Sequence, residues 1–541
     1  MNAFFRALKI EQWFTYRFLR WLFRAIFNWR TARRMMLAIA TIATLIAVAY
    51  AVENWRGRRA WQQFKREVEA QGEHLDIAAF IPAAVPDDQN FAMTPLWRET
   101  FGGDQRSIPF PPLFSVFPSY HKTRFPRRGD WLKGERMDLA EWQRFYRDLH
   151  TEAAANAGKT PELEAFPIPV EAGMPAEDVL IALSRYDEKL KELRAAARRP
   201  ASRFPLRYED GWNMGLNHLS TMQSATVFLT LRSLAELELG RTDAAFADVE
   251  LQFRLIASIE TEPTLVSHLV RISMCPMVLE AIWHGAADHR WTEGELIAVD
   301  EQLRSLDWLS DYDLCCQSER AFTLQILDEM RTTRNSKLFE TVGAWDGTGR
   351  RREKEMWAKL YRWIPIGWFK QNTISYLNAT RRLGSPRTDA SAGYVDVEDW
   401  RQRCERLTTE TAKLKPYTFL LAPLTSWQSE ASLRFIRTEA LVRLARTACA
   451  LERHRLAHGS YPESLDSLAP QFIDAVPRDV INGGELKYRR TDGDHFVLYS
   501  IGWNGKDDGG EVRLWGGRSA PPENRGIDPK EGDWVWKYPA E

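Results

Sequence analysis

An uncharged apolar run near the N-terminus constrains this chain more than any other feature. Residues 35–52 read MMLAIATIATLIAVAYAV, which is 18 residues without a charged side chain. A helix of that length is about the shortest that spans the ~30 Å hydrocarbon core of a bilayer. We therefore predict a single transmembrane helix over residues 35–52.

The charges on either side of this run predict its orientation. Eight lysines and arginines precede it, against a single acid, Glu11. Because basic flanks stay in the cytoplasm, we expect residues 1–34 to be cytoplasmic and the bulk of the chain to lie outside the inner (plasma) membrane. Three arginines that follow the run weaken this bias: Arg56, Arg58 and Arg59.

A cleaved signal peptide is the alternative to a retained anchor. The tripeptide Ala49-Tyr50-Ala51 fits the small-residue pattern of a cleavage site. The charged region before the apolar run is more than 30 residues long, which is unusual for a signal peptide. We therefore favour a retained single-pass anchor.

The segment before the anchor alternates arginines with aromatic residues. On a helix, residues 2–30 would form a basic and aromatic surface suited to an anionic leaflet. Packing on a partner membrane protein is the other interpretation. The segment 1–34 is accordingly predicted to be a cytoplasmic amphipathic element.

Composition excludes some classes of protein. The 541 residues suggest about three domains of ordinary size, and 73 basic side chains balance 73 acidic ones, so no global field favours nucleic acid. Five cysteines occur without C-x-x-C spacing, which fits neither a zinc pattern nor a dense disulfide framework. A bond between the adjacent Cys315 and Cys316 is not expected on a helix, and one long-range bridge stays open.

Amphipathic helices dominate the next part of the sequence. Residues 231–259 contain a helix, a turn at Gly240 and a second helix for which Thr242 is a suitable N-cap. This arrangement resembles one tetratricopeptide-type hairpin, although no 34-residue period recurs clearly. The stretches 264–287, 292–306 and 312–331 continue the helical period. We predict a mainly α protein with a helical-hairpin ectodomain at 53–379.

A polar stretch then separates two regions. Residues 380–393 read TRRLGSPRTDASAG and are the best linker candidate, so we assign 380–424 to a linker and connecting helix. The preceding segment 357–372, WAKLYRWIPIGWFKQN, combines aromatic and basic residues. It suits a membrane surface or a partner, and a buried aromatic cluster is at least as reasonable.

The C-terminal region carries the one recognisable signature. A periodic helix from Ala440 leads to a Tyr461-Pro462 turn, a "VPRD" turn, two alternating strands and a Gly-rich acidic loop. This order resembles the C-terminal domain of type II secretion major pseudopilins. The resemblance implies a small α+β domain over 425–541. The rest of the chain resembles uncharacterised bacterial membrane-anchored proteins.

The acidic loop is the candidate metal site. Asn504, Asp507 and Asp508 offer oxygen atoms of the kind that calcium prefers, on a turn made pliable by glycines. In the pseudopilin family the corresponding loop binds calcium, which the resemblance implies here. Asn504 stands where the family has an aspartate. The alternative is an Asn-Gly hairpin turn with solvated acids.

The resemblance does not extend to assembly. No pilin-type processing site precedes Met35, and a long stretch of chain separates the apolar run from the helix at 429–458. We therefore do not expect a pilin-type helical core. Residues 532–536 alternate and are predicted to form a last strand covering the sheet edge.

Common catalytic motifs are missing from the sequence. Residues 158–160 read Gly-Lys-Thr like the end of a P-loop, but the earlier glycine is replaced by Ala153. Neither G-x-S-x-G nor H-E-x-x-H is present. His454 and His458 share one helix face, as zinc sites require, but no third ligand is indicated, and histidines also suit a helix C-terminus.

Two functions remain open from the sequence. The first is a membrane-anchored, non-enzymatic binding or scaffold protein with partners in the bacterial envelope, associated with a secretion-type assembly through its C-terminal region. The alternative is a membrane-anchored, carboxylate-based hydrolase of unrecognised type, using Glu260 and Glu262 beside Asp243, with the C-terminal domain as a structural cap.

Overall fold

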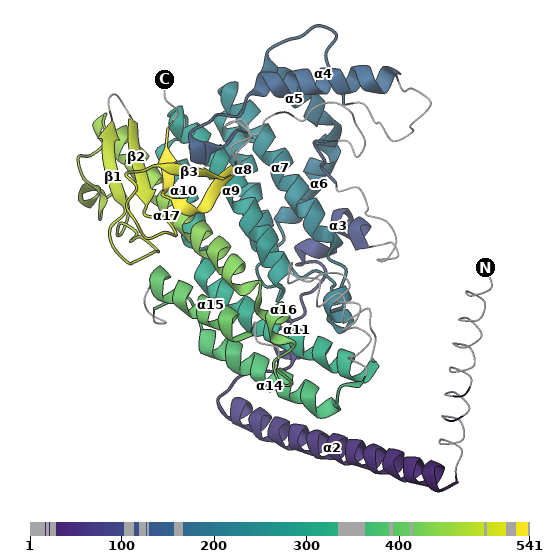
Figure 1. The fold of residues 1–541 in the computed structure, drawn as a ribbon. Helices are drawn as coiled ribbons and strands as arrows, with labels where there is room; N and C mark the ends of the chain where they lie inside the picture. The colour runs from purple at the N-terminus through teal and green to yellow at the C-terminus, as the bar shows by residue number, and fades with distance from the viewer. Residues whose placement is uncertain are drawn as a thin grey trace, which may run out of the picture.

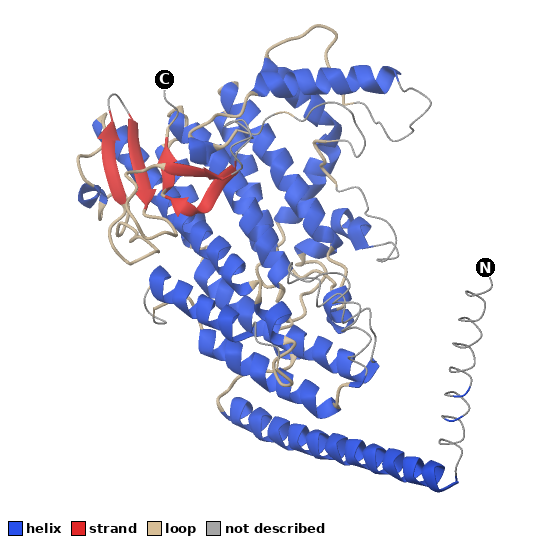
Figure 2. Cartoon of the chain, viewed as in Figure 1, coloured by secondary structure: helices blue, strands red, loops and turns tan. Residues whose placement is uncertain are grey.

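Helices make up most of this structure, and the strands gather near the C-terminus (Figures 1 and 2). The computed structural model describes residues 17, 21, 29–101, 113–117, 126, 129–155, 166–333, 363–388, 393–411, 415–491, 495–515 and 526–538. The predicted mainly α fold with a small strand-containing part is confirmed within these residues. Residues 158–160 of the P-loop-like string lie outside them, as do most of residues 2–30.

The longer helices follow one another with short connections. In chain order they are α2 (Trp29–Ala70), α3 (Pro95–Phe101), α4 (Leu139–Ala155), α5 (Pro175–Leu183), α6 (Asp187–Ala197), α7 (Asn217–Glu238), α8 (Thr242–Ser258), α9 (Leu265–Ala287), α10 (Glu293–Arg304), α11 (Trp308–Thr333), α14 (Ile366–Leu383), α15 (Val397–Thr411), α16 (Leu421–Thr425) and α17 (Gln428–His458).

Among the described residues, two helices are long and apolar enough to cross a membrane, by length and composition alone. The apolar window of α2 has no buried residue, whereas 67% of the corresponding window of α9 is buried inside the protein. α9 is therefore a core helix. The N-terminal part of α2 is a candidate membrane span, as predicted for residues 35–52.

The hairpin around Gly240 is present, but its predicted cap is wrong. α7 and α8 pack along each other, and Gly240 joins them with φ +71°, a conformation that favours glycine. Thr242 is the first residue of α8, and the N-cap position belongs to Arg241, whose side chain makes no capping bond. By contrast, Thr292 caps α10 in a reciprocal capping box with Glu295. A repeat of such hairpins is not shown.

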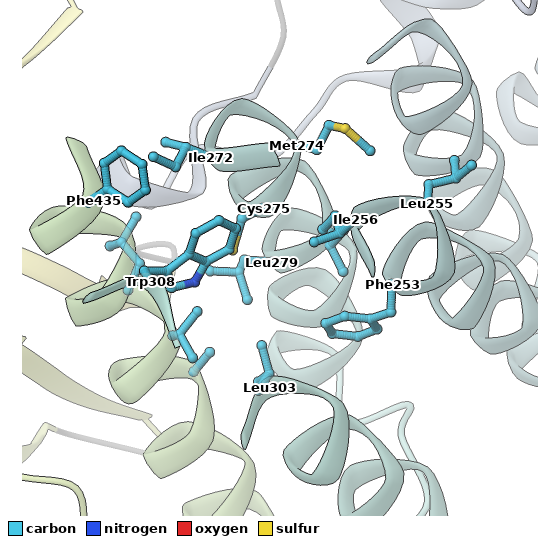
Figure 3. Packing of buried hydrophobic residues seen from close by; sticks show 14 of the residues in the cluster. Phe253, Leu255, Ile256, Ile272, Met274, Cys275, Leu279, Leu303, Trp308 and Phe435 are labelled. Carbon is cyan, nitrogen blue, oxygen red and sulfur yellow. The ribbon is translucent and has the colours of Figure 1, made fainter. Parts of the chain in front are cut away.

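The core is built around α9. Figure 3 shows apolar side chains of α8, such as Phe253 and Ile256, gathered with Cys275 of α9, Trp308 of α11 and Phe435 of α17. Full burial of each such side chain contributes about 1.5–3 kcal/mol. α17 packs against α9, α10 and α11 as well as against the strands. The C-terminal strands thus share one continuous hydrophobic core with the helices.

In the part of the chain that the structure describes, two small antiparallel sheets complete the fold. One has the order β1 (Lys487–Thr491), β2 (His495–Ser500) and β5 (Trp534–Lys537). The predicted tail strand is therefore found one or two residues downstream, paired with β2. Its Trp536 is buried and stacks edge-on against Trp131 at 5.1 Å between ring centroids. The second sheet pairs β3 (Val512–Trp515) with β4 (Gly526–Gly532), which the sequence did not reveal.

The predicted linker begins inside a helix, and the cysteines are unbonded. α14 continues helically through Leu383, and residues 389–392 lie outside the described residues. All five cysteines are in the described part and all are free thiols, so the long-range bridge left open by the sequence is not formed.

Candidate functional site

The predicted metal ligands lie together on the loop between β2 and β3. The Asn504 side chain accepts a hydrogen bond from the Lys506 N–H (3.0 Å) through Oδ1 and donates one to Asp508 Oδ2 (2.8 Å). Asp507 Oδ1 accepts from the Gly509 N–H and from the Tyr499 hydroxyl, each at 3.0 Å. The loop is therefore closed by hydrogen bonds among its own side chains and backbone.

A further carboxylate, which the sequence did not single out, lies beneath this loop. Asp533 is only 1% exposed. Its two oxygens accept the N–H groups of Asp508 (3.3 Å) and Gly510 (2.7 Å). Burial, together with the neighbouring charges of Asp508 and Asp507, raises the pKa of Asp533 to about 6. In the sequence, only its position directly before the predicted tail strand could have indicated that Asp533 lies near this loop.

The loop oxygens are already engaged, and cations lie nearby. Lys487 Nζ is 3.9 Å from Asp507, and Arg513 Nη2 is 3.9 Å from Asp508. Within the described residues, no group of three or more His, Cys, Asp or Glu side chains is arranged to hold a metal ion. The calcium site therefore stays a prediction, which calorimetric titration of the wild type and of an Asp507→Asn, Asp508→Asn double variant checks.

We expect Asp533→Asn to change how stability depends on pH. Since the pKa of Asp533 is raised to about 6 from its ordinary 3.8, this group stabilises the fold most below about pH 4, and that contribution is lost as the pH rises to about 6. Asparagine does not titrate in this range, so it contributes no such pH dependence. The melting midpoint of the wild type minus that of the variant should therefore decrease as the pH rises from 4 to 7. A difference that is constant across this range would contradict the prediction.

A second cluster of polar groups lies in the core around the start of α9. His218 Nε2 is 2.8 Å from Glu262 Oε1, the Ser267 hydroxyl donates to Glu262 Oε2, and His268 Nε2 is 3.0 Å from the Glu262 carbonyl. All four residues are almost completely buried. In a serine hydrolase triad the histidine lies between serine and carboxylate. Here the carboxylate lies between them, so the arrangement is not that relay.

Arg271 extends this cluster towards α11. Its guanidinium is fully buried, donates to Asp311 Oδ2 and, through Nε, donates to the Ile256 carbonyl at 2.9 Å. The same group lies 5.0 Å above the Trp308 ring. Arg271 thus joins α8, α9 and α11 through charged and polar contacts at the centre of the core.

The carboxylates of the hydrolase hypothesis do not meet. Asp243 is exposed in the first turn of α8, whereas Glu260 and Glu262 follow its other end. The 17 residues of α8 separate the two groups by about 25 Å, at a rise of about 1.5 Å per residue. The proposed grouping with Asp243 was wrong because a helix places its ends far apart.

The histidine pair on α17 is engaged internally. The rings of His454 and His458 stack at 4.3 Å between centroids. His454 Nδ1 lies 2.9 Å from the Ser460 carbonyl, and His458 Nδ1 lies 3.1 Å from the His454 carbonyl. These contacts are typical of the C-terminal end of a helix, where the last backbone carbonyls lack an intrahelical hydrogen-bond donor.

The surface carries an open groove of about 840 Å³ between α9, α17 and the β3–β4 hairpin, which we name the α9–α17 groove. Its apolar lining residues are Leu269, Ile272, Pro276, Leu433, Leu441, Ile527, Pro529 and Trp515. Charged side chains of both signs also line it, namely Glu430, Arg434, Arg437, Asp528, Lys530 and Glu531. Trp515 is 71% exposed, a large fraction for an indole. The groove therefore combines an apolar floor with an exposed aromatic side chain on its wall.

Arg437 supplies a cation to the α9–α17 groove. Burial lowers its pKa, and Asp130 is the opposing charge that acts on it. Its Nε is buried and has no hydrogen-bond partner among the described residues. An unpaired buried donor is costly, by about 1–3 kcal/mol. Arg437 thus brings a half-buried guanidinium, with Asp130 as its opposing charge, to the lining of the groove.

Comparisons with known proteins give no relative. No family model, no curated protein and no solved structure matches this chain.

Proposed function

We propose that this chain is a membrane-anchored, non-enzymatic binding or scaffold protein of the bacterial envelope, held in the inner membrane with its N-terminus in the cytoplasm. The observation that carries the proposal is the α9–α17 groove, with its exposed Trp515 and with Arg437, whose Nε has no hydrogen-bond partner among the described residues. Tryptophan and arginine are the side chains most enriched at the energetic centres of protein interfaces.

Retention of the anchor is supported by a contact across the possible cleavage site. The Tyr50 hydroxyl donates to the Trp363 carbonyl of the folded body. Cleavage after Ala51 would remove Tyr50 and this contact. α2 also continues without a break from Trp29 to Ala70, so the apolar part and the packed part form one helix.

The partner that fits the groove is a protein segment with an apolar side chain next to an acidic one. The apolar residue would pack on Leu269 and Pro276, which are half-buried, while the acid would pair with Arg437. β4 forms one wall of the groove, so the C-terminal region would take part directly in binding. A secretion-type assembly is the kind of partner proposed on the pseudopilin resemblance.

The hydrolase alternative finds no specific support in the described residues. Perturbed acids often mark active sites. Asp248, whose pKa burial raises to about 6, is fully buried between Arg194 and Arg232 and has no access to a ligand. Glu262 is enclosed in the core in the same way. These pairings account for Asp248 and Glu262 as structural groups.

The test is co-purification from crosslinked membranes. We expect the tagged wild type to recover specific envelope proteins, and Trp515→Ala combined with Arg437→Gln to recover at least about tenfold less, since each interface anchor contributes about 2 kcal/mol or more. Leu456→Ala is the matched control. Leu456 lies on α17, the helix that carries Arg437, and it is exposed but outside the groove. Equal recovery by all three proteins would contradict the proposal.

A further inference from the structure

The end of the apolar run is joined tightly to the folded body by two glycines. α2 and α14 pack along each other (Figure 1). Gly57 of α2 faces Gly367 of α14. A Cβ placed on Gly367 would lie 1.9 Å from the Glu53 carbonyl oxygen. The two helix backbones therefore touch at a point only a few residues beyond Val52.

Polar contacts fix the start of α14 at the same level. The Gly367 N–H donates to Asn54 Oδ1 at 2.8 Å. Glu53 Oε2 accepts from Trp368 Nε1 at 3.0 Å and from the Tyr417 hydroxyl at 2.7 Å. With the Tyr50–Trp363 contact, these bonds hold residues 363–368 beside residues 50–54 of α2.

The side chains at this level have the composition of a membrane interface. Trp363 is 71% exposed, Trp55 57% and Ile366 37%. Arg59 lies 5.6 Å over the Trp55 ring, and Arg56 is about half exposed. Tryptophan is enriched at the headgroup level of membrane proteins, and arginine is attracted to anionic headgroups.

Helix geometry sets the height of this surface. The 18 residues of the apolar run extend for about 27 Å at a rise of about 1.5 Å per residue, which matches the hydrocarbon core. Val52 then lies at the extracytoplasmic boundary of that core. Trp363 and Ile366, tied to residues 50–54, lie within a few Å of the same boundary.

We propose that the N-terminal end of α14, through Trp363 and Ile366, rests in the phospholipid headgroup layer beside the emerging α2. The inference relies on the proposed retained anchor and goes beyond it, because it makes the membrane a second contact of the folded body. With the rigid α2–α14 junction, this contact fixes the height and tilt of the ectodomain, and with them the position of the α9–α17 groove above the membrane.

The experiment measures the depth of single labelled positions in the full-length protein. The protein is placed in nanodiscs of phosphatidylethanolamine and phosphatidylglycerol, and a nitrobenzoxadiazole fluorophore is attached at Ile366→Cys or at Ile181→Cys. Ile181 on α5 is the matched control, because it is 39% exposed, also helical and at the far end of the body from α2 (Figure 1). Leu45→Cys reports whether α2 itself is inserted.

The native thiols do not interfere with this labelling. All five are buried or half-buried, and burial raises the pKa of each one, to about 12 for Cys275 and Cys316 and about 11 for Cys404. The thiolate is the reactive form, so brief labelling near pH 7 favours the introduced cysteine. Unsubstituted protein treated in the same way is the blank.

We expect nitroxide-lipids labelled near the headgroup to quench the fluorophore at residue 366 several-fold more than the one at residue 181, and lipids labelled deep in the acyl chain to quench the one at residue 45. Quenching at residue 45 with equal values at 366 and 181 would overturn the interfacial contact and leave the anchor standing. No quenching at residue 45 would overturn the retained anchor and, with it, this inference.

Discussion

Replacing Arg271 with methionine is expected to lower the free energy of unfolding by about 3–5 kcal/mol, because it leaves the buried Asp311 carboxylate without its cation. The substitution also removes the hydrogen bond to the Ile256 carbonyl and the stacking over Trp308. Methionine fills much of the space of arginine, so the decrease in the free energy of unfolding comes mainly from the loss of the guanidinium charge. Denaturant unfolding of the purified protein in detergent measures it.

A double variant separates the charge from the packing. Arg271→Met combined with Asp311→Leu removes both charges and should recover much of the stability, since apolar replacement of a whole buried ion pair is often neutral. Arg304→Met on α10 is the matched control. Arg304 forms an ion pair with Asp474, with 2.6 Å between Nη2 and Oδ2, and both side chains are mostly exposed. Exposed ion pairs contribute at most about 1 kcal/mol. An Arg271→Met protein no less stable than Arg304→Met would show that the buried network is not structural.

Gly367→Ala is expected to destabilise the α2–α14 junction by about 2–3 kcal/mol, against the direction that helix propensity predicts. In a helix, replacing glycine with alanine normally gains up to about 1 kcal/mol. Here the new methyl group would lie 1.9 Å from the Glu53 carbonyl oxygen, so the two backbones must move apart, and overpacking of this kind costs about 1–3 kcal/mol. Melting midpoints and limited proteolysis after Ala70 measure the effect.

Gly294→Ala on α10 is the control for this substitution. Gly294 is also a helical glycine, but a Cβ there meets no atom within 4 Å. We expect it to be neutral or slightly stabilising. If Gly367→Ala behaved as Gly294→Ala does, the close contact of α2 and α14 would not exist, and the inferred height of Trp363 above the membrane would lose its basis.

Local patterns predicted the elements of this fold well where each element carries its own signal. The apolar period at 264–287, 292–306 and 312–331 matches α9, α10 and α11 within a few residues. Cap placement was less certain, because threonine also fits the first helical turn. Thr242 occupies that turn, whereas Thr292 has Glu295 three residues later and forms the reciprocal cap.

Contacts between distant segments could not be predicted from these patterns. The pairing of Gly57 with Gly367 joins residues about 310 positions apart, and neither glycine stands out in the sequence. α17 was expected to begin a separate C-terminal domain, and the structure packs it against α9, α10 and α11 as part of the common core. Periodicity shows that a helix has an apolar face and does not show what covers that face.

The same limit applies to the candidate sites. Asn504, Asp507 and Asp508 lie together because they are neighbours on one loop, and their role as metal ligands stays a prediction. Asp533 joins them only through the pairing of distant strands, and Arg437 reaches the groove through its position on α17. The grouping of Glu262 with Asp243 failed because sequence spacing was read without the length of α8 between them.

Site-directed photo-crosslinking in intact cells tests the central claim, binding through the α9–α17 groove, most directly. A photoreactive amino acid is placed at Trp515 of β3, in the groove, or at Leu456 of α17, outside it. The account predicts a discrete envelope-protein adduct at position 515 that disappears with Arg437→Glu, and no such adduct at position 456. No adduct at 515, or the same adducts at both positions, would contradict it.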